Sequence, residues 1–220
     1  MKKLVWIALL SWVSHVSLAQ KAFKEGTITF AATWTGGDNV PAEMVDAFPK
    51  EITTFYKDGK SFSGMEISMM GQTMKMNVVM ETTPAKMTML MDMMGQKIGI
   101  VSSEEDMKTI MDTIQISYEY LDFKKQIAGY NCQKVIAKMG SGQTMEMFVT
   151  NDLVMPQSQY TMTFKGLKGT PLEFTQKQNG LTVKMVATSI KEGSVDAGKF
   201  VIPEGYMMMT MKEAAAMGLN

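Results

Sequence analysis

The sequence predicts a mainly β fold of the α+β class: a curled, unclosed, barrel-like antiparallel sheet with two or three short covering helices. Apolar and polar residues alternate in one run after another, turn-forming dipeptides separate these runs, and few segments have helical spacing. About ten strands are expected, and a sheet of that size tends to curl or to split into two layers.

Residues 1–19 have the pattern of a bacterial secretory signal peptide. Lys2 and Lys3 precede an apolar run from Leu4 to Val13, and Ser17 and Ala19 are small residues before the expected cleavage point. A membrane anchor is less favoured, since about 20 apolar residues are needed to span a bilayer. Residues 20–220 are therefore expected to form a single exported domain, either periplasmic or secreted.

The first half of the mature chain predicts six strands and one short helix. Asp58-Gly59 is a strong signal for a tight hairpin, and Thr83-Pro84 separates two methionine-rich strands. Residues 40–48 favour a short helix with Pro41 in its first turn. The expected strands are residues 27–34, 52–56, 62–69, 73–80, 87–93 and 98–101.

After Val101 the pattern predicts a helix and then further strands. Ser102 and Glu105 fit a capping box, and the apolar residues from 107 to 114 have helical spacing. Thr210 and Glu213 predict a second capped helix near the C-terminus. The expected strands are residues 116–123, 127–139, 145–149, 160–164, 172–174 and 181–185, with a hairpin turn at Asn179-Gly180.

The composition argues against several classes of function. His15, the only histidine, lies in the signal peptide, and all 22 basic residues are lysine. The mature chain therefore has no imidazole for a catalytic triad or metal site and no guanidinium for bidentate phosphate recognition. Its net charge is −2, from 20 lysines and 22 acidic residues, so it lacks the excess of positive charge that is typical of proteins that bind nucleic acid. No enzymatic activity, cofactor or nucleic-acid partner is expected.

The single cysteine, Cys132, can form no intramolecular disulfide. A free cysteine in an exported protein is either buried or a reactive thiol. Burial as a small apolar residue is the favoured interpretation, because free cysteine is among the most buried residue types.

Methionine is the most informative residue type in the chain. Eleven of the 26 methionines fall between Met65 and Met94, and many of them occupy every second position. Because strand side chains alternate between faces, these strands are expected to carry one soft apolar face and one mostly polar face.

Three interpretations of this face remain open. The methionines fill a core, or they line a pliable cavity for an apolar ligand, or they bind Cu(I) through thioethers, with oxidant buffering as a related role. The cavity interpretation predicts a lipid acyl chain or a lipidated protein as partner, transient contact with an envelope membrane and no obligate oligomer. The candidate lining residues are Met74, Met76, Met80, Met87, Met89, Met91, Met93, Met145, Met147, Phe30, Trp34, Tyr160 and Phe164; no metal ligands are assigned.

Three ordered motifs carry a resemblance to a known family. They are Ile127-Ala-Gly-Tyr-Asn-Cys132, Gly169-Thr-Pro-Leu-Glu173 and Pro203-Glu-Gly-Tyr206, and the stretch from Met91 to Gln96 fits as well. Together they resemble an exported bacterial family defined as a domain of unknown function.

That family is similar in architecture to the periplasmic lipoprotein carriers and sorting proteins. The resemblance implies an unclosed barrel wrapped around short helices, with acyl chains held in the apolar cavity between them. One departure is visible, because the carriers use an arginine to hold their helical lid and this chain has no arginine. That mechanism is therefore not transferred.

Overall fold

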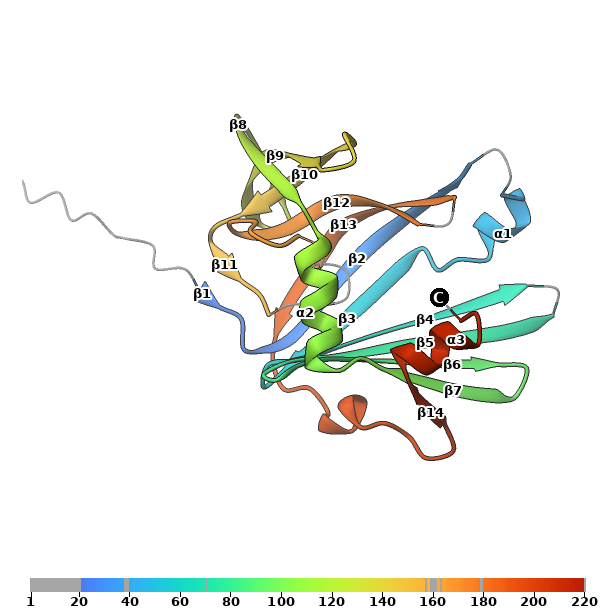
Figure 1. Cartoon of the computed structure of the whole chain (residues 1–220). Coiled ribbons are helices and arrows are strands. Elements are labelled where there is room, and N and C mark those ends of the chain that lie inside the picture. The colour runs from blue at the N-terminus through green and yellow to red at the C-terminus, as the bar shows by residue number, and fades with distance from the viewer. Residues whose placement is uncertain are drawn as a thin grey trace, which may run out of the picture.

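The computed structural model describes residues 21–37, 40–69, 71–156, 158, 162, 164–178 and 180–219 (Figure 1). Twelve strands in this part of the chain form one large curled sheet that is not closed into a barrel, so the predicted mainly β fold class is confirmed. A short parallel pair, β1 (Lys21–Ala22) with β11 (Leu153–Val154), forms a second sheet. The predicted signal peptide, residues 1–19, lies outside the described residues.

The large sheet has the strand order β14-β7-β6-β5-β4-β3-β2-β13-β12-β10-β9-β8. Its pairs are antiparallel, as predicted, except that β14 runs parallel to β7. Gly99 of β7 leaves room for Met208 of β14, since a Cβ there would meet the Met208 thioether. The strands are β2 (Glu25–Gly36), β3 (Glu51–Lys57), β4 (Lys60–Met69), β5 (Gln72–Thr82), β6 (Ala85–Met93), β7 (Gln96–Val101), β8 (Ile116–Ile127), β9 (Tyr130–Met139), β10 (Thr144–Thr150), β12 (Thr170–Gln178), β13 (Leu181–Glu192) and β14 (Met207–Thr210).

The predicted short helices are present among the described residues. They are α1 (Ala42–Asp46), α2 (Glu104–Thr113) and α3 (Met211–Ala216), together with a 3-10 helix, η1 (Ala197–Phe200). The capping box of Thr210 and Glu213 at α3 is confirmed. Helix α1 is shorter than the predicted 40–48, and Pro41 is its N-cap.

The capping box predicted for α2 is wrong by one residue. Ser103, not Ser102, is the N-cap, and Asp106, not Glu105, completes the box. The reason is that Ser102 belongs to the end of the sheet: its Oγ accepts a hydrogen bond from the Met87 backbone N–H at 2.9 Å and donates one to the Met87 carbonyl at 3.2 Å.

Two strand predictions in the second half of the chain are also wrong. The predicted strand 127–139 starts too early, because β8 extends to Ile127 and the chain turns at Ala128 and Gly129, both with positive φ. Of the predicted strand 160–164, Met162 lies in a turn and Phe164 outside any strand, while Tyr160 lies outside the described residues. Met162 and Phe164 are nevertheless buried, so their alternation records burial and not strand structure.

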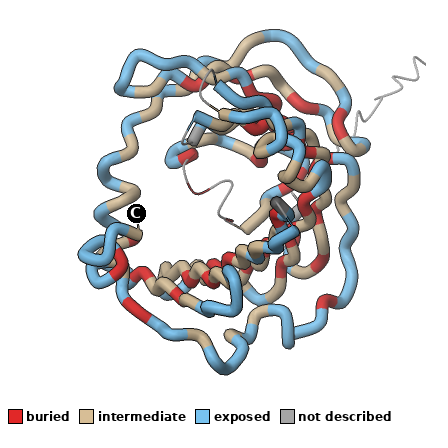
Figure 2. Tube along the Cα trace, turned by 90° about the vertical axis from the view of Figure 1, so that its right-hand side faces the viewer, coloured by how far each residue is buried: buried red, intermediate tan, exposed pale blue. Residues whose placement is uncertain are grey.

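Helix α2 connects the two ends of the curled sheet. It follows β7, next to one edge strand, and leads into β8, the opposite edge strand (Figure 1). Its Met107 belongs to a buried cluster with Val78 and Met80 of β5. We call the face of the sheet that α2 contacts the inner face and the opposite one the outer face. In the side view the chain follows a ring-shaped outline (Figure 2).

The main core lies on the inner face of the central strands. Phe30 of β2 stands opposite Ile52 of β3, and both are almost fully buried. Phe174 of β12 meets Phe30 edge to face, with ring centroids 5.8 Å apart, and meets Phe164 in the same way at 5.3 Å. Edge-to-face pairs of this kind add stabilisation beyond area burial.

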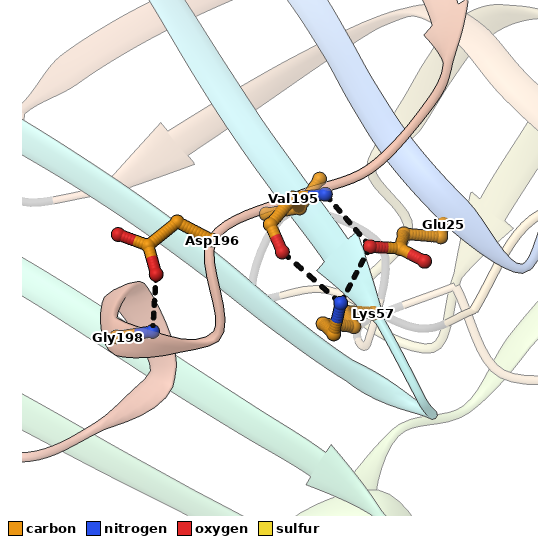
Figure 3. Close-up of polar contacts among 5 residues, drawn as sticks. All are labelled: Glu25, Lys57, Val195, Asp196 and Gly198. Atoms are coloured by element: carbon orange, nitrogen blue, oxygen red, sulfur yellow. Dashed lines mark hydrogen bonds and ion pairs between the residues drawn. The ribbon is translucent and has the colours of Figure 1, made fainter.

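The segment 193–206 crosses the outer face on its way from β13 to β14. Figure 3 shows its anchor: the Glu25 carboxylate accepts hydrogen bonds from Lys57 Nζ at 2.6 Å and from the Val195 backbone N–H at 2.7 Å. Lys57 also donates to the Val195 carbonyl at 3.1 Å. Further along, Lys199 Nζ lies 4.4 Å from the centre of the Phe55 ring. These contacts fix the path that brings β14 to β7.

We expect the anchor to depend on pH. The hydrogen bond from Lys57, followed by that from Val195, lowers the pKa of Glu25 in the folded protein. A lowered folded pKa adds stability above the unfolded pKa of about 4.3 and loses it as the pH falls through the folded value. Glu25→Gln should therefore lower the melting temperature at pH 7, and the difference from wild type should shrink between about pH 5 and pH 3.

Thermal unfolding followed by circular dichroism measures this difference. Glu204→Gln, at an exposed glutamate of the same segment, is the matched control. A difference between Glu25→Gln and wild type that stays constant over this pH range would contradict the assignment.

Candidate functional site

Four neighbouring strands, β4 to β7, carry all their charged side chains on the outer face. Their continuous antiparallel register and the alternation of side chains place every Lys, Asp and Glu of these strands on one side. Two outer-face ion pairs, Lys60 with Glu81 at 3.1 Å and Lys75 with Glu66 at 2.9 Å, follow from this register. The outer-face charged residues are Lys60, Glu66, Lys75, Glu81, Lys86, Asp92 and Lys97.

The inner face of the same strands holds the predicted methionines. Cross-strand pairing sets Met74 opposite Met93, Met76 opposite Met91 and Met80 opposite Met87, while Met89 stands opposite Val78. All seven methionines predicted on β5 and β6 therefore share one uncharged face. Their burial differs along the hairpin, since Met80 is 2% exposed and Met93 is 47% exposed.

Helix α2 covers one end of this face and forms what we call the α2 cluster. Met80, Met107 and Met162 are buried together with Val78, and Met87, Met89 and Ile110 pack against them. The cluster thus gathers thioethers from β5, β6, α2 and the loop after β11. Sequence reasoning placed Met107 on a helix but did not predict which strands that helix would cover, and it missed Met107 and Met162 as members of the site.

Both ends of α2 are tied to their surroundings. At the N-terminus, the hydrogen bonds of Ser102 with Met87 join the helix to β6. Near the C-terminus, Lys165 Nζ donates to Asp112 at 2.9 Å and to the Met111 carbonyl at 3.2 Å. The Lys165 pair is largely exposed and is therefore a weak tie compared with the buried cluster.

The other candidate lining residues lie elsewhere on the inner side. Phe30, Met147 and Phe164 are buried within the main core, and Trp34 and Met145 pack against it. Trp34 also donates from Nε1 to the Pro49 carbonyl at 2.8 Å and stacks on Phe48. Tyr160 lies outside the described residues. The twelve candidates that the structure describes therefore divide between the main core and the methionine face.

A pocket of about 420 Å³ opens beside the C-terminal end of α2. Its apolar walls come from Met111 of the helix and from the segment between β11 and β12, where Met155, Phe164 and Leu167 contribute. Phe164 is its one wall residue among the predicted lining residues. The other walls were missed because the pocket joins α2 to a segment more than 40 residues away in the chain, and sequence periodicity does not report such a contact. A smaller pocket of about 260 Å³, lined by Ala85, Ser102 and others, lies at the N-terminal end of α2.

Cys132 is buried, as predicted. Burial raises the pKa of its thiol to about 11, and the thiol donates a long hydrogen bond to the Tyr130 carbonyl. The thiolate is the reactive form, so the buried Cys132 acts as a packing residue of the main core.

Within the described ranges no group of three or more His, Cys, Asp or Glu residues is arranged to hold a metal ion. In that same part of the chain, helices of the length and hydropathy needed to cross a bilayer are absent.

Comparisons with known proteins add little to this site. No family model matches the chain, and a search of the curated proteins gives no match. Among the solved structures, fourteen chains match, and one of them is the crystal structure of MucB. That match has 9% sequence identity and a TM-score of 0.31, and it covers 82% of this chain and 57% of the MucB chain. The chain thus spans little more than half the length of that structure, and the likeness assigns no function.

The α2 cluster makes a prediction about stability. Met107→Ala removes a side chain that is 3% exposed, and a buried Met→Ala change typically costs about 2–5 kcal/mol. Met217→Ala, at a methionine that is 62% exposed, should change the free energy of unfolding by about 0.5 kcal/mol or less. Urea denaturation of both variants measures the contrast, and equal effects would show that α2 is not held by this cluster.

The buried thiol makes a second prediction. In the native protein at pH 8, Cys132 should react with a thiol reagent such as dithionitrobenzoate much more slowly than in denaturant, because burial suppresses the thiolate. Absorbance after addition of the reagent, with and without urea, measures both rates. Rapid reaction of the native protein would contradict the burial.

Proposed function

We propose that this chain is an exported, non-enzymatic binding protein that holds an apolar ligand, either a lipid acyl chain or the acyl group of a lipidated protein. The observation that carries the proposal is the uncharged inner face of β4 to β7, which meets α2 through the methionines of the α2 cluster. Export is proposed on the signal-peptide pattern of residues 1–19.

The methionines make this face adaptable. Their unbranched thioether side chains have three rotatable bonds and repack around guests of different shape, as on surfaces that bind many partners. A core made only for stability is better specified by Leu, Ile and Val, which have fewer rotamers. An acyl chain that enters between α2 and the sheet would gain about 0.8 kcal/mol for each buried CH₂ group.

The pocket beside α2 is the proposed entry point. Its volume of about 420 Å³ lies in the usual range for ligand pockets of roughly 300–1,000 Å³. Leu153, Met155 and Leu167 offer apolar walls, and Lys165 stands at the same pocket with its ammonium beside Asp112. A ligand with an apolar chain and an anionic head would suit this combination. Delivery of such a ligand implies transient contact with an envelope membrane or with a lipidated partner.

The test combines recovery of a natural ligand with a pocket-filling variant. Native mass spectrometry of protein purified from the bacterial envelope should show mass beyond the polypeptide, and a fluorescent fatty acid should bind in titration. Leu167→Trp fills the pocket and should weaken fatty-acid binding by about tenfold or more, which corresponds to about 1.4 kcal/mol. Val201→Trp adds the same ring at an exposed position outside that pocket and should bind as wild type does.

Two results would overturn the proposal. Recovery of the bare polypeptide together with no fatty-acid binding would show that the protein holds no apolar ligand and favour a structural domain with a filled core. Equal fatty-acid binding by wild type and Leu167→Trp would show that the ligand does not bind in the pocket beside α2.

A further inference from the structure

Beyond the part of the hairpin that α2 covers, β5 and β6 carry two directly opposed methionine pairs. Met74 faces Met93 and Met76 faces Met91, and the two pairs are neighbours along the strands. We propose that these four residues, the methionine quartet, bind one soft monovalent metal ion, Cu(I), through their thioether sulfurs.

The register brings the four side chains within reach of one ion. Directly opposed residues of an antiparallel pair have Cβ atoms about 4.5–5.5 Å apart, and positions i and i+2 of one strand are separated by about 6.8 Å. Methionine is long and flexible, so four sulfurs that start from this square converge by rotation about side-chain bonds. Met65 of β4 stands opposite Met76 and offers a fifth thioether in the same row.

The quartet is open to an incoming ion, whereas the α2 cluster is not. Met74, Met76 and Met91 are partly exposed, and Met93 is 47% exposed. In the α2 cluster, Met80 and Met107 are only 2% and 3% exposed. An ion reaches the quartet without any displacement of α2.

The charge pattern selects the kind of ion. Every carboxylate of β4 to β7, Asp92 among them, lies on the outer face, so no carboxylate of these strands shares the quartet's side of the sheet. Thioethers are neutral and soft and select Cu(I) over hard ions such as Mg²⁺ and Ca²⁺. A neutral ligand set also suits a monovalent ion better than a divalent one, because each extra uncompensated charge raises the cost of leaving water.

This site is separate from the proposed acyl site. The quartet shares no residue with the α2 cluster or with the pocket beside α2. Metal binding and fatty-acid binding can therefore succeed or fail independently, and each has its own variants.

The direct test is competition for Cu(I) against the chelator bicinchoninate under anaerobic, reducing conditions. Wild type should withdraw one equivalent of Cu(I). The variant Met74→Leu/Met76→Leu/Met91→Leu/Met93→Leu should bind at least about tenfold more weakly, since loss of ligand-set residues commonly costs 10–100-fold in affinity. The control changes four other methionines to leucine, Met44, Met139, Met208 and Met217, and should retain wild-type affinity.

Two further measurements keep the proposal testable if the fourfold variant is poorly folded. The pairwise variants Met74→Leu/Met93→Leu and Met76→Leu/Met91→Leu each remove one opposed pair and should each weaken binding. In protein with ¹³C-labelled methionine methyl groups, Cu(I) should shift the resonances that these substitutions assign to the quartet. Equal affinity of wild type and the pairwise variants, or shifts confined to other methionines, would overturn the proposal.

Discussion

The methionine-rich half of the molecule depends on one constraint, the uninterrupted register of β4, β5, β6 and β7. Because side chains alternate with a period of two, a slip of one residue in any of these strands would carry its charged residues to the inner face and its methionines to the outer one. On the outer face, the ion pairs Lys75–Glu66 and Lys60–Glu81 stabilise the native register. On the inner face, packing of Met80 against Met107 of α2 stabilises it.

The open sheet is held in its curled form by the segments that join its distant parts. Helix α2 runs from β7 to β8 and packs on the inner face, while residues 193–206 cross the outer face and deliver β14 to β7. The Glu25–Lys57–Val195 contacts fasten the outer segment to β2 and β3, and the hydrogen bonds of Ser102 with Met87 fasten α2 to β6. Curvature therefore comes from these two connections as well as from strand twist.

Along one hairpin the same residue type meets two environments. Near the β5–β6 turn, where α2 packs, the thioethers are buried, and at the other end of the hairpin, near the turns to β4 and β7, they are partly exposed. Burial in the first part favours an apolar guest that replaces methionine contacts with its own, whereas exposure in the second leaves the sulfur lone pairs available to a soft ion. Methionine suits both roles because it is at once apolar, flexible and polarizable.

The sequence alone determined the mainly β class, the β5–β6 hairpin and its methionine face, the burial of Cys132 and the cap of α3, because each depends on local periodicity or turn chemistry. It misplaced the cap of α2, since the choice between Ser102 and Ser103 depends on a hydrogen bond to β6. It misread Met162 and Phe164 as strand residues, because alternation records burial and the partner surface is distant in the chain. Only the tertiary structure decided which strands α2 covers, that Met107 and Met162 join Met80, and where the pocket lies, since these contacts link residues far apart in sequence.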